Sequence, residues 1–127
     1  MKEILMIGAG GFLGSTARYG LSRLLTNAGG FFATMWGTFT ANILGCLLLG
    51  LIYGFSERVG SMGQPWRLFL TVGFCGGFTT FSTFIHENFT AMSEGRFLQS
   101  AAYGVASLIL GLGAVWAGHL IAEYFRA

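Results

Sequence analysis

The chain has 127 residues, of which 54% are hydrophobic and only 9% are charged. Soluble domains carry about 25% charged residues, so this composition predicts a membrane protein. The net charge of +2 comes from scattered side chains and gives no indication of a nucleic-acid partner. Cys46 and Cys75 fall in apolar stretches without the CxxC spacing of a zinc or redox site, and a disulfide is not expected either.

Four apolar stretches are each long enough to cross a bilayer, which takes about 20 residues. They cover residues 4–25, 31–55, 66–89 and 97–125. Short links join them, so residues 1–127 are predicted to form a single all-α domain of four transmembrane helices. The first stretch lacks the cleavage pattern of a signal peptide and is predicted to remain as a span. Because no extramembrane domain is left for a soluble catalytic site, an enzyme is not expected.

The first stretch contains a glycine-rich run, residues 7–14, that looks like a dinucleotide-binding turn. The fingerprint requires a glycine where Leu13 stands and an acidic residue about 20 positions later. No Asp or Glu occurs between Glu3 and Glu57. Gly10 and Gly14 are therefore interpreted as a GxxxG helix-packing face.

Arg18 lies well inside the first predicted span. A charge at this depth costs at least a few kcal/mol unless it faces protein or water. Two interpretations remain open. The side chain extends to the near membrane surface, or it forms the floor of a watery vestibule that attracts anions.

The second stretch contains an isolated amide, Asn42, among apolar residues. Thr38 and Gly45 lie four residues before it and three after it, so the three share one helical face. The amide either bonds a neighbouring helix or donates from its NH₂ group to an anion.

The third stretch carries the most informative motif, GFCGGFTTFSTF at residues 73–84. Each glycine weakens a helix by roughly 1 kcal/mol relative to alanine. Four hydroxyl residues follow closely: Thr79, Thr80, Ser82 and Thr83. We expect a helix that is broken near mid-membrane, since protein or a watery cavity can cover such backbone and broken helices build ion sites. The alternative is close helix packing through Gly73 and Gly77.

Aromatic and polar residues around this motif indicate an anion path. Phe81 and Phe84 lie three residues apart on one helical face, and aromatic ring edges are electropositive. With Asn42 and nearby hydroxyls, they are suited to a small, hard anion. In the fourth stretch, Tyr103 and Ser107 begin a narrow polar line that continues to Gly111. That line either bonds helices together or forms the wall of a pathway.

The histidines and most acidic residues lie near the ends of predicted spans. His86 and Glu87 are near the end of the third, and His119 and Glu123 are near the end of the fourth. These residues are expected at the membrane surface. The chain contains no aspartate, so a Ser-His-Asp triad is excluded, and two histidines on different helices do not indicate a metal site.

The motifs together resemble a known family along essentially the whole chain. The run GFCGGFTTFSTF, with GxxxGSxAR in the first stretch and GTxxxN in the second, is similar to the bacterial CrcB/Fluc fluoride channels. The resemblance implies a fluoride-selective channel for passive export from the cytoplasm through the bacterial inner membrane. It also implies an antiparallel, dual-topology homodimer with two pores and a central structural Na⁺.

The resemblance also assigns individual residues. It places the Na⁺ ligands on the backbone carbonyls of Gly76 and Thr79, and it matches Glu87 to the acidic residue beyond the phenylalanines. Gly111 stands where relatives can carry a further hydroxyl. The predicted fluoride pathway comprises Arg18, Thr38, Asn42, Phe81, Ser82, Thr83, Phe84, Tyr103 and Ser107.

The basic residues divide almost evenly between the two membrane sides. Lys2, Arg58, Arg67 and Arg126 lie on one side, against Arg18, Arg23 and Arg96 on or toward the other. This distribution gives almost no positive-inside bias and predicts insertion in both orientations. The alternative functions are a small four-helix proton-coupled multidrug antiporter, which requires a carboxylate near mid-membrane, and a non-transporting scaffold.

Overall fold

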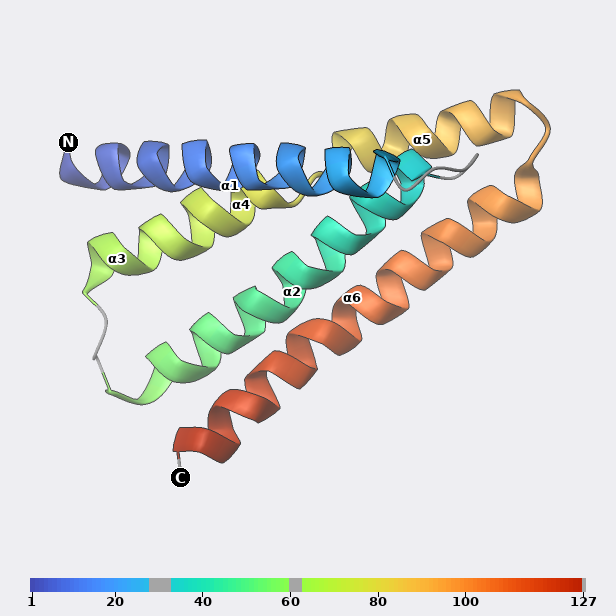
Figure 1. Ribbon diagram of the computed structural model, residues 1–127. Helices are drawn as coiled ribbons and strands as arrows, with labels where there is room; N and C mark the ends of the chain where they lie inside the picture. Colours follow the sequence, from blue (N-terminus) through green and yellow to red (C-terminus); the bar gives the residue numbers. More distant parts are fainter. Residues whose placement is uncertain (28–32, 60–62, 127) are drawn as a thin grey trace.

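The computed structural model describes residues 1–27, 33–59 and 63–126 (Figure 1). Within these residues the protein consists of helices and short connections, without strands. The elements in chain order are α1 (Lys2–Asn27), α2 (Ala33–Val59), α3 (Gln64–Leu68), the π-helical segment η1 (Phe69–Cys75), α4 (Gly76–Phe78), α5 (Ser82–Ser93) and α6 (Phe97–Arg126). The all-α prediction is confirmed.

Three of the predicted spans correspond to helices that are long and apolar enough to cross a membrane. They cover Thr34–Ser56, Gln64–Ser93 and Phe97–Phe125. The span predicted over residues 4–25 forms one long helix, α1, but glycines, hydroxyls and Arg18 dilute its apolar character and it does not belong to this group. The predicted start of the second span, residues 31 and 32, lies outside the described residues.

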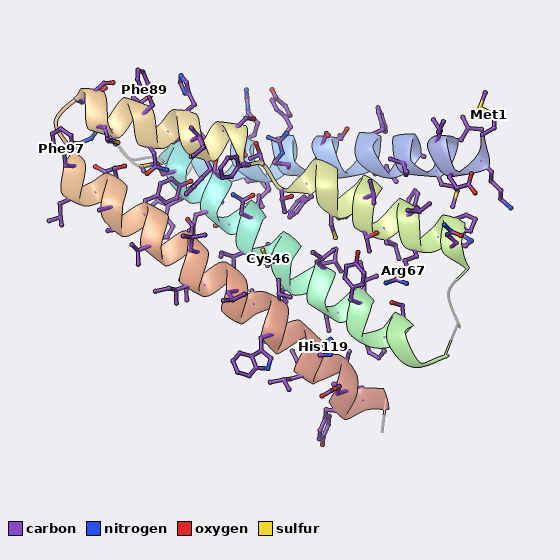
Figure 2. All side chains as sticks on the ribbon, turned by 180° about the vertical axis from the view of Figure 1, so that it is seen from behind. Met1, Cys46, Arg67, Phe89, Phe97 and His119 are labelled. Atoms are coloured by element: carbon purple, nitrogen blue, oxygen red, sulfur yellow. The ribbon has the colours of Figure 1, made fainter. Side chains whose placement is uncertain are left out.

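The segments α3, η1 and α4, with α5 after the break, are together called the third helix. The helices form two pairs, α1 with the third helix and α2 with α6, and α2 also contacts α1. Figure 1 shows α1 running alongside α3 and α4, and α2 running alongside α6. Met1 and Arg67 lie toward one end of the molecule, whereas Phe89 and Phe97 lie at the other (Figure 2). The chain therefore crosses from end to end four times.

Glycines set the close approach of α1 to the third helix. A Cβ on Gly10 would lie 3.1 Å from the Gly73 Cα atom and 2.9 Å from the Phe74 nitrogen. A Cβ on Gly77 would lie 2.8 Å from the Gly11 carbonyl oxygen. Gly14 is likewise buried against the backbone of Phe74 and Phe78. The interpretation of Gly10 and Gly14 as a packing face is confirmed.

The helix break is present, but it begins after the glycines. Gly73, Gly76 and Gly77 are all helical, and the irregular segment is residues 79–81. Helical glycine is tolerated here because it permits backbone contact with α1. The expected break is therefore present, and Gly73 and Gly77 in addition serve the close helix packing that was the alternative.

Small residues also join α2 to α6. A Cβ on Gly118 would lie 2.8 Å from the Leu51 nitrogen, and a Cβ on Gly54 would lie 2.6 Å from the Ala122 Cβ. Gly50 packs on the backbone of Val115. Both helix pairs thus depend on positions where no side chain larger than hydrogen fits.

The α1 interface gives a matched test. Gly10→Ala introduces a methyl group against the third helix, so we expect a loss of about 1–3 kcal/mol from overpacking. Gly8→Ala places the same group where nothing lies within 4 Å and should be neutral or gain about 1 kcal/mol of helix propensity. Thermal unfolding in detergent measures both. Equal melting temperatures for the two variants would contradict the packing assignment.

Candidate functional site

The site is built around the irregular segment between α4 and α5. Thr79 leaves the helical conformation with φ −90° and ψ 160°, and α5 begins again at Ser82. A break exposes backbone N–H and C=O groups, each of which needs a partner inside a bilayer. The surrounding side chains supply several of these partners.

Asn42 of α2 bonds both backbone groups of Thr80. Its Nδ2 donates to the Thr80 carbonyl at 3.1 Å, and the Thr80 N–H donates to its Oδ1 at 2.7 Å. In an unbroken helix that N–H would bond the carbonyl of Gly76. The amide oxygen therefore takes the place of the carbonyl that would bond this N–H in a continuous helix. The interpretation of Asn42 as bonding a neighbouring helix is confirmed.

Arg18 bonds the backbone from the other side. Its Nε donates to the carbonyl oxygen of Gly77 at 3.1 Å, and the side chain is half-buried. A carbonyl just before a break lacks the backbone N–H that would bond it in a continuous helix, so a guanidinium is a suitable donor. Sequence reasoning considered the membrane surface and a vestibule for this arginine but missed the bond to the broken helix.

The predicted hydroxyl cluster serves the break itself. The Thr79 hydroxyl donates to the Cys75 carbonyl at 2.9 Å. The Thr80 hydroxyl accepts from the Thr83 N–H at 3.3 Å and donates to the Thr83 hydroxyl at 3.1 Å. Ser82 and Thr83 lie on the exposed surface of the chain, so their place in the pathway stays a prediction.

A cavity of about 360 Å³ opens beside the break, between α2, the third helix and α6. Most of the residues predicted for the site line it: Asn42, Gly76, Thr79, Phe81, Phe84 and Ser107. Within the described residues, the buried Oγ of Ser107 has no hydrogen-bond partner. The cavity is largely apolar, with Asn42 on one side and Ser107, whose unpaired hydroxyl oxygen is enclosed by protein, on another.

The two phenylalanines lie together at the edge of this cavity. Their ring centroids are 6.1 Å apart with planes tilted by 40°. Phe81 is 74% exposed, whereas Phe84 is half-buried and meets the Tyr103 ring edge-on at 5.0 Å. The two rings are therefore neighbours, although Phe81 lies in the irregular segment just before α5 rather than on the helix itself.

Glu87 connects two further predicted residues. The Thr38 and Tyr103 hydroxyls each donate to its carboxylate at 2.8 Å, so one acid links α2, α5 and α6. It was expected at the membrane surface, and this link was missed. Its position three residues after Phe84, on the same helical face, was the available signal.

The Arg18 bond can be tested against a neighbouring arginine. Arg18→Ala removes a charged donor from the Gly77 carbonyl, so we expect a loss of roughly 1.5–3 kcal/mol and faster amide hydrogen exchange in residues 79–83. Arg23→Ala, on the exposed surface of the same helix, is the control. Unchanged exchange in the Arg18 variant would show that the bond does not hold the break.

Comparison of the sequence with known proteins finds relatives over nearly the full chain. The family described as CrcB-like protein, Camphor Resistance (CrcB), matches residues 5–119. A fluoride-specific ion channel FluC of Bacteroides fragilis is 45% identical, with 99% of this chain and 100% of the relative covered. FluC of Chlorobium phaeobacteroides is 42% identical, covering 97% and 96%, and that of Leptospira interrogans is 41% identical, covering 92% and 91%. The chain belongs to the CrcB family.

Proposed function

We propose that this protein is a fluoride-specific ion channel that lets fluoride leave the cytoplasm passively and so limits its toxicity. The observation that carries the proposal is the cavity beside the break, where Asn42, Ser107 and two phenylalanines converge. Full-length relatives that are fluoride channels support it. They do not favour the alternative of a proton-coupled drug antiporter.

The donors at this cavity suit a small anion. The Ser107 hydroxyl has no partner within the described residues, and Asn42 has a second amide hydrogen beyond the one given to Thr80. The ring edges of Phe81 and Phe84 add weak positive potential. None of these groups carries a full charge, which allows the ion to leave again. Chloride is larger than fluoride and is expected to fit this cavity poorly.

Thr38 and Tyr103 take part through Glu87. Both hydroxyl hydrogens are donated to its carboxylate, so they reach fluoride only when Glu87 releases them. In the meantime Tyr103 supports the ring of Phe84. We therefore propose that Thr38, Tyr103 and Glu87 position the ring of Phe84. Their hydroxyls would also form a second part of the fluoride path.

Passive transport is sufficient for export. Fluoride enters as neutral HF, ionises in the cytoplasm and is driven outward by the inside-negative potential. That potential supplies about 2.3 kcal/mol per charge per 100 mV. We therefore propose that the channel lies in the bacterial inner membrane, across which this potential acts, and that export needs no pump.

We further propose that α1 is a fourth span and that two chains form an antiparallel dimer. The cavity is open on a face where Phe81 and Leu108 are 74% and 75% exposed, and a second chain would cover this face. The nearly even division of basic residues supports insertion in both orientations.

The dimer proposal also includes a Na⁺ held by the carbonyls of Gly76 and Thr79. The Thr80 N–H is directed to Asn42 rather than back to Gly76, and the extended backbone of Thr79 turns its carbonyl out of the helix. Such oxygens suit a hard cation. Two copies of each would give four ligands, and the ion's role would be structural.

Dual topology predicts that reporter fusions at the C-terminus show both orientations in one culture. The four basic residues on one side nearly balance the three on the other, so neither orientation is preferred. Adding three lysines next to the C-terminus should then give mainly one orientation. A single orientation in the unmodified protein would contradict this proposal.

The Na⁺ proposal predicts that the dimer weakens when Na⁺ is replaced by N-methylglucamine. The dimer fraction can be measured by cross-linking in detergent. Thr79→Ala keeps the backbone carbonyl and should retain the Na⁺ dependence. An equal dimer fraction in both cations would refute a structural Na⁺.

Fluoride efflux from liposomes tests the function itself. Phe81→Ile and Phe84→Ile keep an apolar side chain but remove the ring edge, so we expect each to reduce fluoride efflux at least tenfold, equivalent to about 1.4 kcal/mol. Phe89→Ile, on the same helix but away from the cavity, should retain it. Chloride efflux is the selectivity control.

Two outcomes would contradict the assignment. Full fluoride efflux in the Phe81→Ile, Phe84→Ile double variant would exclude the ring-edge mechanism. Chloride efflux close to that of fluoride in the unmodified protein would exclude a fluoride-specific channel.

A further inference from the structure

Two thiols lie at the proposed ion path without a role in it. Cys46 on α2 and Cys75 at the end of η1 are the only cysteines of the chain, and both are free. Both line the cavity that contains Asn42 and Ser107. Cys75 is 3% exposed, so its sulfur is enclosed by protein.

The register between α2 and the third helix places the two cysteines opposite each other. Asn42 bonds Thr80, and the next contact along α2 sets Gly45 against the Thr79 side chain. Cys46 follows Gly45 directly, and Cys75 lies one turn before Thr79, to which its carbonyl is bonded at 2.9 Å. Both residues therefore border the same stretch of the cavity. Figure 2 shows Cys46 near the middle of α2.

The third wall of this site is a glycine. The Cys46 sulfur lies 3.6 Å from the position that a Cβ on Gly111 would occupy, and Gly111 is buried. The absence of a side chain at this position on α6 leaves room beside the sulfur.

We propose that Cys46 and Cys75 form a two-thiolate binding site for a soft cation such as Hg²⁺ or Ag⁺. Thiolates are the ligands that soft metals prefer, and Hg²⁺ and Ag⁺ bind two sulfurs in a nearly linear arrangement. With Hg²⁺, each thiol loses one proton and two Hg–S bonds form, which releases two protons to solvent. The resulting complex has no net charge, so an apolar cavity can hold it without a large desolvation cost.

Occupation of this site also has a consequence for transport, which rests on the proposed function. The metal would share the cavity with Asn42 and Ser107, the two donors assigned to fluoride. Bound Hg²⁺ therefore blocks the path by occupying its volume. The unmodified chain should lose fluoride efflux on treatment with HgCl₂.

Binding is measured on the full chain in detergent by native mass spectrometry, after HgCl₂ treatment and a challenge with excess glutathione. Two sulfurs on one metal should resist this monothiol roughly 100-fold better than one. We expect the unmodified protein to retain one Hg²⁺ per chain and to release two protons per metal bound. Cys46→Ser and Cys75→Ser should each lose the metal.

A rearranged variant controls for the number of thiols. Cys75→Ser combined with Val72→Cys keeps two cysteines, but the second lies on the exposed side of η1, where Val72 is 52% exposed. This variant should lose Hg²⁺ as the single variants do. Size-exclusion profiles identify any misfolded variant, for which Cys46→Ala or Cys75→Ala is then used.

Several results would overturn the site. Single variants that retain Hg²⁺ as well as the unmodified chain would show that the thiols do not act together. Two Hg²⁺ per chain would show independent binding, and one Hg²⁺ per two chains would place the metal between chains. Retained Hg²⁺ with undiminished fluoride efflux would refute the blocking. Absence of fluoride efflux before any Hg²⁺ is added would instead count against the proposed function, because retention is measured without transport.

Discussion

The structure depends on satisfying the backbone where the third helix is interrupted. A bilayer offers no water to the freed N–H and C=O groups, so the neighbouring helices must supply partners. α2 supplies Asn42, which bonds both groups of Thr80, and α1 supplies Arg18, which bonds the Gly77 carbonyl. These bonds therefore fix three helices relative to one another.

Glycine packing is what brings those donors within reach. The backbones of α1 and the third helix touch at Gly10 and Gly73, which is closer than any side chain would allow. The same device joins α2 to α6 at Gly54 and Gly118, bringing Tyr103 and Ser107 to the site. The glycines at these contacts therefore serve the positioning of a few polar side chains.

Much of this arrangement could be predicted from the sequence because its signals are local. Apolar length indicated the helices, GxxxG spacing indicated the α1 packing face, and an isolated amide indicated a polar contact at depth. Other features depend on which helices meet, and local patterns do not contain that information. The place of Glu87 on the helical face of Phe84 could be predicted, but its partners could not, because Thr38 and Tyr103 lie 49 and 16 residues away in the chain. Arg18 had two plausible destinations until the position of Gly77 was known.

The π-helical segment η1 has a consequence for how the chain can vary. The Gly76 N–H bonds the Thr71 carbonyl, five residues back, so this segment contains one residue more than an α-helix of the same rise. Each residue of an α-helix rotates the following ones by about 100°. Loss of one residue from η1 would convert the segment into a regular α-helix. It would also rotate the residues on one side of the deletion, so that either Gly73 would no longer face α1 or Thr80 would no longer face Asn42. Side chains facing outward in η1, such as Val72, can be exchanged, whereas the length of the segment cannot.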